Sequence, residues 1–167
     1  MALSNDRIYS SVTENDGLFK ACQQGDLQTL ERSLRSFSSS DIASIRDEQK
    51  ATLVHHAARY GHINILEYLI ERKHLDISQL RTEHGATCAH DAAVCDQVEV
   101  LNYIFHYHQI NQHNKQNLFE KLRWTVRDEQ GNSPLHLGKF NKRFYFEKNI
   151  FQFSCCLWFN TKSSLFT

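Results

Sequence analysis

The sequence predicts an all-α protein of stacked helix–turn–helix units joined by short β-turn hairpins. The first observation is a recurring phrase: GATCAHDAA at residues 85–93 matches KATLVHHAA at residues 50–58, which lies 35 residues earlier. GNSPLHLG at residues 131–138 opens the same phrase 46 residues later and then departs from it. The second observation is that apolar residues after the two full phrases fall at helical spacing. A phrase repeated at this period is typical of a helical repeat array, whose units bury their apolar faces by stacking.

Each copy of the phrase carries a predicted helix cap. A Thr or Ser is followed three residues later by His, and a hydroxyl at a helix start can accept the unpaired backbone N–H three residues on. The His ring can bond back toward the same cap. We therefore predict structural caps at Thr52 with His55, Thr87 with His90, and Ser133 with His136. The alanine pair that follows the His in two copies predicts a seam at which neighbouring helices approach closely.

The repeat phrases divide the chain into units. The polar residues 1–14 are predicted to be a flexible N-terminus, and a degenerate fourth unit follows three complete ones. The predicted units are residues 15–46, 47–80, 81–123 and an incomplete 124–138. Within them, serines 36 and 38–40 predict a loop, and residues 106–123, rich in Asn, Gln and His, predict an insertion.

Residues 139–167 form a tail that departs from the repeat pattern. They contain no Gly, Ala, Asp or Pro but hold seven of the eleven phenylalanines. Three interpretations stay open: a truncated or read-through gene model, a divergent hydrophobic cap on the stack, or a membrane-surface segment. The apolar run NIFQFSCCLWF is too short to span a bilayer.

Composition narrows the class of protein. Nineteen basic and nineteen acidic residues cancel, so nucleic acid is a poor candidate for a partner. The five cysteines are odd in number and contain no CxxC pair, which favours a reducing, intracellular compartment. No signal peptide and no integral membrane segment are predicted. We expect a cytoplasmic protein that is monomeric.

The phrases KATLVHHAARYGHINILEYLI, GATCAHDAAVCDQVEVLNYIF and GNSPLHL resemble the ankyrin repeat, whose core phrase is G-x-T-P-L-H-x-A-A-x-x-G-H. The chain departs from that phrase at four places: Leu53 and Cys88 replace proline, and Lys50 and Asp96 replace glycine. The resemblance implies an ankyrin-repeat solenoid of L-shaped units, each with two antiparallel helices and a projecting hairpin. It also implies a concave groove lined by hairpin tips and inner helices.

A narrower likeness is to the N-terminal ankyrin repeats of the espin family. VHHAAR at residues 54–59 and GAT-x-AHDAA at residues 85–93 carry it. Espins organise actin filament bundles, and their ankyrin region engages other proteins, including tails of class III myosins. The resemblance therefore implies a cytoskeleton-associated scaffold that binds protein partners. The later repeats and the actin-bundling module of espins have no counterpart here, so a truncated or fragmentary member is expected.

The positions that the repeat leaves variable are the candidate partner-binding residues. They lie between the capping His and the alanines, directly after the alanines, or at the predicted hairpin tips. These residues are His56, Arg59, Tyr60, Asp91, Val94, Cys95, Lys50, Glu83 and His84. Arg and Tyr are enriched at binding hot spots, which favours a partner here. The competing interpretation is a solvated face with no partner, and a generic ankyrin adaptor or regulatory subunit in signalling is the alternative function.

Two patterns that could indicate chemistry have simpler explanations. Cys88, Cys95, His90 and Asp91 contain the residue types of a Cys–His–Asp triad, but the cap and the packing seam already account for their positions. Three histidines at 106, 108 and 113 could bind a metal, yet no carboxylate or Cys is spaced to complete a site. We therefore predict no enzymatic activity, no metal and no cofactor.

Overall fold

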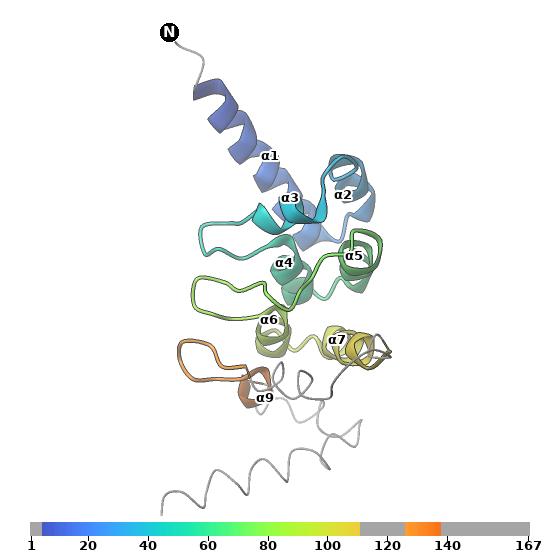
Figure 1. Cartoon of the computed structure of the whole chain (residues 1–167), viewed down its shortest axis with the longest axis vertical. Helices are drawn as coiled ribbons and strands as arrows, with labels where there is room; N and C mark the ends of the chain where they lie inside the picture. The colour runs from blue at the N-terminus through green and yellow to red at the C-terminus, as the bar shows by residue number, and fades with distance from the viewer. Residues whose placement is uncertain (1–4, 111–125, 138–167) are drawn as a thin grey trace, which may run out of the picture.

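The computed structural model describes residues 5–110 and 126–137, and this part of the chain contains helices and no strand. The helices stand in two columns (Figure 1). The inner column holds α1 (Asn5–Gln24), α4 (Leu53–Tyr60), α6 (Cys88–Val94) and α9 (Pro134–Leu137), and the outer column holds α2 (Leu27–Ser33), α5 (Ile63–Glu67) and α7 (Val98–Ile110). The prediction of an all-α stack of helix pairs is confirmed.

The core follows the repeat. Leu30, Leu66 and Leu101 occupy equivalent places on the three outer helices, and each is at most 3% exposed. The predicted alanine pairs of α4 and α6 are also buried, and these inner helices pack directly on each other. Because Ala carries only a methyl group, the helix axes can come close at this seam. Apolar burial of this kind, spread over every unit, is what holds a stack together.

Three hairpins project from the same side of the stack (Figure 1). Each is closed by a backbone hydrogen bond between residues four apart: Asp47 N–H to Ala51 O at 3.0 Å, Thr82 N–H to Ala86 O at 3.0 Å, and Asp128 N–H to Asn132 O at 2.8 Å. In the first and third hairpins, the carboxylate of the opening Asp also accepts N–H groups within the turn. The turns are therefore fixed by short-range bonds.

Neighbouring hairpins are joined tip to tip. The Glu83 N–H donates to Gln49 O at 2.8 Å, and the Glu129 N–H donates to His84 O at 3.0 Å. These bonds connect units that are distant in the sequence. They connect the three hairpins into one continuous row along the stack.

Two residues occupy left-handed backbone positions where other units have glycine. Lys50 has a φ of 58°, and the equivalent Gly85 and Gly131 have 74° and 79°. Asp96 has a φ of 58° at the end of an inner helix, where Gly61 has 82°. Side chains other than Gly are strained in this region, so both substitutions cost stability.

The helices depart from the sequence expectations at three places. The first helix begins at Asn5, ten residues before the predicted start of the first unit and inside the segment expected to be flexible. The serine-rich segment, expected to be a loop, contains the short helix α3 (Ser39–Ser44). Helix α7 runs to Ile110, so the first part of the predicted insertion is helical. The rest of the insertion and the tail 139–167 lie outside the described residues.

The second outer helix ends in an unusual way. After α5 the chain continues as a π-helix, Tyr68–Arg72, and the Lys73 that follows turns back to the first unit. Its ammonium donates to the backbone carbonyls of Leu34, Arg35 and Phe37, with the last two at 3.4 and 3.2 Å. One charged side chain of the second unit thereby holds the segment of the first unit that follows α2.

Candidate protein-binding surface

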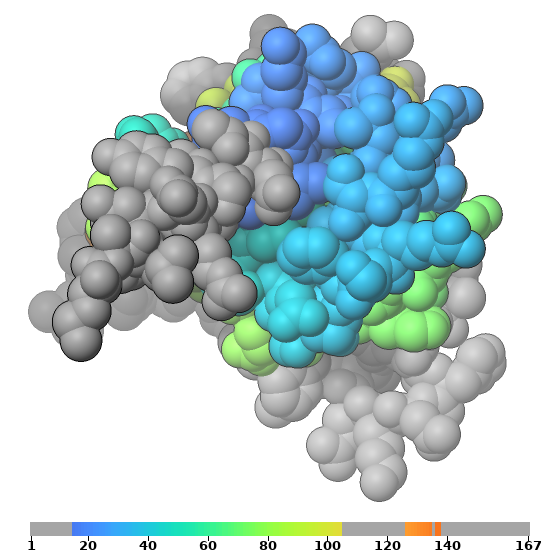
Figure 2. All heavy atoms as spheres, turned by 90° about the horizontal axis from the view of Figure 1, so that it is seen from above, coloured from blue at the N-terminus to red at the C-terminus, as the bar shows by residue number. Residues whose placement is uncertain are grey.

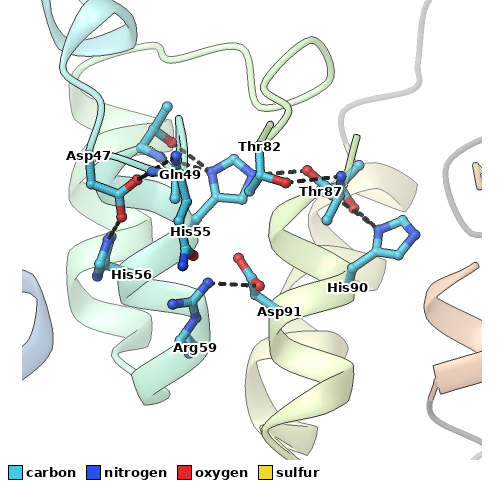
Figure 3. A network of polar contacts seen from close by, with 12 residues as sticks. Asp47, Gln49, His55, His56, Arg59, Thr82, Thr87, His90 and Asp91 are labelled. Atoms are coloured by element: carbon cyan, nitrogen blue, oxygen red, sulfur yellow. Dashed lines mark hydrogen bonds and ion pairs between the residues drawn. The ribbon is translucent and has the colours of Figure 1, made fainter. Parts of the chain in front are cut away.

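The capping histidines connect one unit to the next. The Thr52 N–H donates to His55 Nδ1 at 3.2 Å, and the Thr52 hydroxyl lies 2.9 Å from the same nitrogen. Since Nδ1 accepts a hydrogen bond, the proton of the neutral ring is on Nε2, which lies 3.2 Å from Ala86 O in the next hairpin. One ring therefore holds its own helix start and the neighbouring hairpin (Figure 3).

The later copies repeat this arrangement. The Thr87 N–H and hydroxyl lie 3.1 and 2.8 Å from His90 Nδ1, and His90 Nε2 lies 3.1 Å from Asn132 O. In the fourth unit, Ser133 Oγ lies 2.5 Å from His136 Nδ1. The predicted pairs therefore make the local bonds of a cap and, in two units, a bond to the next hairpin that the sequence did not indicate.

Both buried capping histidines are held neutral. Burial lowers the pKa of His55 to about 4, and burial also lowers the pKa of His90. A second proton would have to sit on Nδ1, directly opposite the donating N–H of the cap. The rings are thus structural groups, and they have no free nitrogen for general-base chemistry or for a metal.

His56 was expected to face a partner, and this was wrong. It is 6% exposed, and its ring lies against Phe19 of the first unit with centroids 4.8 Å apart. Its Nε2 lies 2.8 Å from Asp47 Oδ2, and Gln23 Nε2 lies 3.4 Å from its Nδ1. His56 therefore joins α4 to α1 and to the base of its own hairpin (Figure 3).

Asp91 pairs with a residue of the neighbouring unit. Arg59 Nη2 lies 3.2 Å from Asp91 Oδ1, and the Asp91 side chain is 14% exposed. Within the described residues, its second oxygen is buried and has no hydrogen-bond partner. Burial raises the pKa of the Asp91 carboxyl despite the neighbouring Arg59. The residue is strongly constrained and is not an open acceptor for a partner.

The other candidates on the inner helices are open to solvent. Tyr60 is 47% exposed at the end of α4, Val94 is 66% exposed at the end of α6, and Cys95 follows it on the surface. Cys95 is exposed, but the partial burial of its sulfur still raises the pKa of the thiol. Since the thiolate is the nucleophilic form, this environment does not activate the cysteine.

The hairpin tips are exposed as well. Lys50 Nζ lies 3.1 Å from Glu83 Oε1, and His84 Nδ1 lies 3.5 Å from Glu129 Oε2. These pairs connect successive tips, but all four side chains are about half exposed or more. Such pairs contribute little to stability and can exchange partners easily. We use the name hairpin–helix face for the exposed residues Tyr60, Val94 and Cys95 together with the tips Lys50, Glu83 and His84.

Sequence reasoning missed two sets of contacts between units. Arg46 Nη1 donates to Lys50 O at 2.7 Å and to Arg81 O at 2.8 Å, which fixes the ends of two hairpins. His62 Nε2 lies 3.0 Å from Gln23 O, and Gln97 Nε2 donates to Arg59 O at 3.2 Å from the equivalent place. A signal existed for the arginine, because Arg46, Arg81 and Arg127 each stand directly before a hairpin.

Among the residues that the structure describes, no three His, Cys, Asp or Glu side chains come together as metal ligands. The histidine candidates fall outside this test, since His113 and the side chains of His106 and His108 are not described. No helix in the described ranges is long and apolar enough to cross a membrane.

Stacked helix pairs, projecting hairpins and a hydroxyl–His cap at the start of α4, α6 and α9 define a helical-repeat domain. Residues 18–117 match the family model for ankyrin repeats, described as three copies. The chain belongs to the ankyrin-repeat family, whose repeats mediate protein–protein interactions and are generally not enzymes. A comparison with curated proteins finds no significant match.

Proposed function

We propose that this protein is a non-enzymatic, espin-like scaffold that binds a protein segment along its hairpin–helix face and associates with the actin cytoskeleton. The observation that supports the binding role is the position of the exposed apolar side chains. The large hydrophobic residues exposed in the described part of the chain are Phe37, Tyr60 and Val94. Two of these three lie at the ends of adjacent inner helices. Exposed Tyr beside apolar neighbours favours a contact surface.

The rigidity of the surface supports the same role. The tip-to-tip backbone bonds and the capping histidines hold successive hairpins in fixed positions. A partner that docks on a preformed surface loses less conformational entropy than one that must order it. The face therefore favours an extended or helical segment that contacts the second and third units together.

The cytoskeletal part of the proposal rests on the resemblance of residues 54–59 and 85–93 to the espin repeats. Espins imply two partner candidates, actin filaments and a class III myosin tail. The test is retention of the full chain by filamentous actin in co-sedimentation and by an immobilised myosin tail peptide. Tyr60→Ala should weaken peptide binding about tenfold, as expected for a side chain worth about 1–2 kcal/mol in an interface.

Phe37→Ala is the matched control, because Phe37 is a similarly exposed aromatic on the first unit, away from the hairpin–helix face. It should leave binding unchanged. Both variants should keep the wild-type melting temperature. If the folded chain is retained by neither actin nor the myosin peptide, the espin-like assignment is wrong and a generic ankyrin adaptor becomes the better hypothesis.

A further inference from the structure

The segment between α2 and α3 differs from the rest of the surface. Residues 35–41 are all exposed, the longest such run among the residues whose burial is described. They form a serine-rich stretch, RSFSSSD, in the first unit. The first unit lies at the end of the stack that faces the viewer in Figure 2. None of these side chains contributes to the buried core. A stretch of this kind is accessible to other proteins.

Two arginines precede one of its serines at regular distances. Arg35 lies three residues before Ser38, and Arg32 lies six residues before it. Both side chains are exposed, and no hydrogen bond or ion pair to either is found within the described residues. Their guanidinium groups are available to the carboxylates of another protein.

We propose that Ser38 is a phosphorylation site for a serine kinase that recognises arginine before its acceptor. ATP would be the phosphoryl donor. The Ser38 Oγ would form a bond to the γ-phosphorus while the bond from that phosphorus to the β–γ bridging oxygen breaks. ADP leaves, and the hydroxyl proton passes to the catalytic carboxylate of the kinase and then to solvent.

Ser38 is also the place where a phosphate would change the local structure. Its hydroxyl donates to Asp41 Oδ2 at 2.6 Å and accepts the Asp41 N–H at 3.2 Å, and its own N–H donates to the same carboxylate at 2.9 Å. A phosphate ester has no hydroxyl proton to donate and is itself anionic. It would therefore expel the Asp41 carboxylate from the cap of α3.

Positive groups next to the cap can receive the phosphate. The Lys73 ammonium lies 3.2 Å from Phe37 O, the carbonyl directly before Ser38, and Arg35 is on the same segment. Phosphorylation would make the phosphate, rather than the Asp41 carboxylate, the acceptor at the start of α3, and these cations would pair with the phosphate. The switch stays local, because Ile42 and Ile45 of the core follow the segment and need not leave it.

Asp41 raises a competing possibility, since a kinase that recognises acidic residues could use a carboxylate three residues after Ser38. The structure favours the arginine-directed class. The Asp41 carboxylate accepts hydrogen bonds from Ser38, which lower the pKa of that carboxyl. The Arg35 guanidinium makes no hydrogen bond within the described residues.

The test treats the full chain with Mg-ATP and a calmodulin-dependent serine kinase that requires arginine three residues before its acceptor. Intact mass and fragment mapping should find one phosphoryl group on Ser38. Arg35→Gln should slow the reaction about tenfold, as expected for loss of a charge-assisted contact. Arg72→Gln is the matched control, because Arg72 is an exposed arginine on an outer helix of the second unit.

Ser38→Ala should abolish the modification, and Ser38→Thr, which keeps both the hydroxyl and the cap, should restore it. Phosphate on Ser36, Ser39 or Ser40, with Ser38→Ala unaffected, would overturn the proposal. So would an acidic-directed kinase that modifies Ser38 in a manner sensitive to Asp41→Asn while the arginine-directed kinase leaves the chain unmodified.

Discussion

Mild acid should destabilise the stack, because His55 is buried in its neutral form. Burial lowers its pKa from an ordinary value of 6.5 to about 4 in the folded protein. The unfolded chain therefore binds a proton at a higher pH than the folded chain does. The stabilisation that depends on neutral His55 is complete above about pH 6.5 and is lost progressively as the pH falls toward about 4.

The size of the effect follows from the shift. One pKa unit corresponds to about 1.4 kcal/mol, so the full shift of His55 amounts to roughly 3 kcal/mol, of which about 2 kcal/mol is lost by about pH 5. The lowered pKa of His90 adds in the same direction. The raised pKa of Asp91 acts against both, since protonation relieves the cost of burying that carboxylate. For a domain that is stable by only about 5–15 kcal/mol, the net loss should be readily measured.

The assay is urea unfolding followed by far-ultraviolet circular dichroism at about pH 7.5, 6 and 5. His55→Gln isolates the effect of His55, because Gln can accept the Thr52 N–H but does not titrate. This variant should be less stable at neutral pH, since Gln does not reproduce the bond to Ala86 O, and should lose less stability on acidification. His84→Gln serves as control, because this hairpin-tip His is 69% exposed and leaves both capping histidines in place.

A His55→Gln variant that loses as much free energy of unfolding in acid as the wild type would refute the reasoning. It would mean that the ring is not held neutral by the cap and the next hairpin. His84→Gln with a flattened pH dependence would point to the exposed tips as the origin of the acid sensitivity.

Three further changes test other parts of the structure. Thr87→Ala should cost about 1 kcal/mol in urea unfolding through the lost cap, and Thr87→Ser should recover most of it; equal stability of all three proteins would contradict the cap. Asp96→Gly should stabilise by about 0.5–1 kcal/mol, because Gly adopts the positive φ without strain, and Asp96→Ala should not stabilise at all. Asp91→Asn should leave the melting temperature unchanged or raise it, because it removes a buried charge with an unsatisfied oxygen, whereas Arg59→Leu should lower it by leaving that charge unpaired; the reverse order would sink this account of the pair.

The sequence predicted those features that depend on residues close together in the chain. A hydroxyl and a His three residues apart sit on one turn of helix, so the Thr52–His55 pair needs no information from elsewhere. The same logic could have found α3, since Ser38 and Asp41 have the spacing of a capping box. Serine clusters are also typical of loops, and in this segment the capping pattern within the cluster decides the local structure.

The side-chain contacts between units could not be predicted from the sequence. His56 and Arg59 lie on one helix, and periodicity gave both of them an exposed position. The structure separates them by what the neighbouring units supply: Phe19 and Gln23 cover His56, while Asp91 reaches Arg59 from the other side. Such contacts depend on side-chain lengths and rotamers in units about 35 residues apart, and no local pattern encodes them.

These contacts between units limit which residues can contact a protein partner. GATCAHDAA offers a Cys, a His and an Asp, yet in the structure the His bridges two units, the Asp pairs with Arg59, and the Cys is buried. The position next to the capping His, which a repeat leaves variable, serves cohesion between units in both copies. A partner therefore finds its freely exposed side chains farther along, at the helix ends with Tyr60 and Val94 and at the hairpin tips. Substitutions at His56 should alter binding mainly through stability, Asp91→Asn should change binding little, and substitutions at Tyr60 or Val94 should alter binding directly.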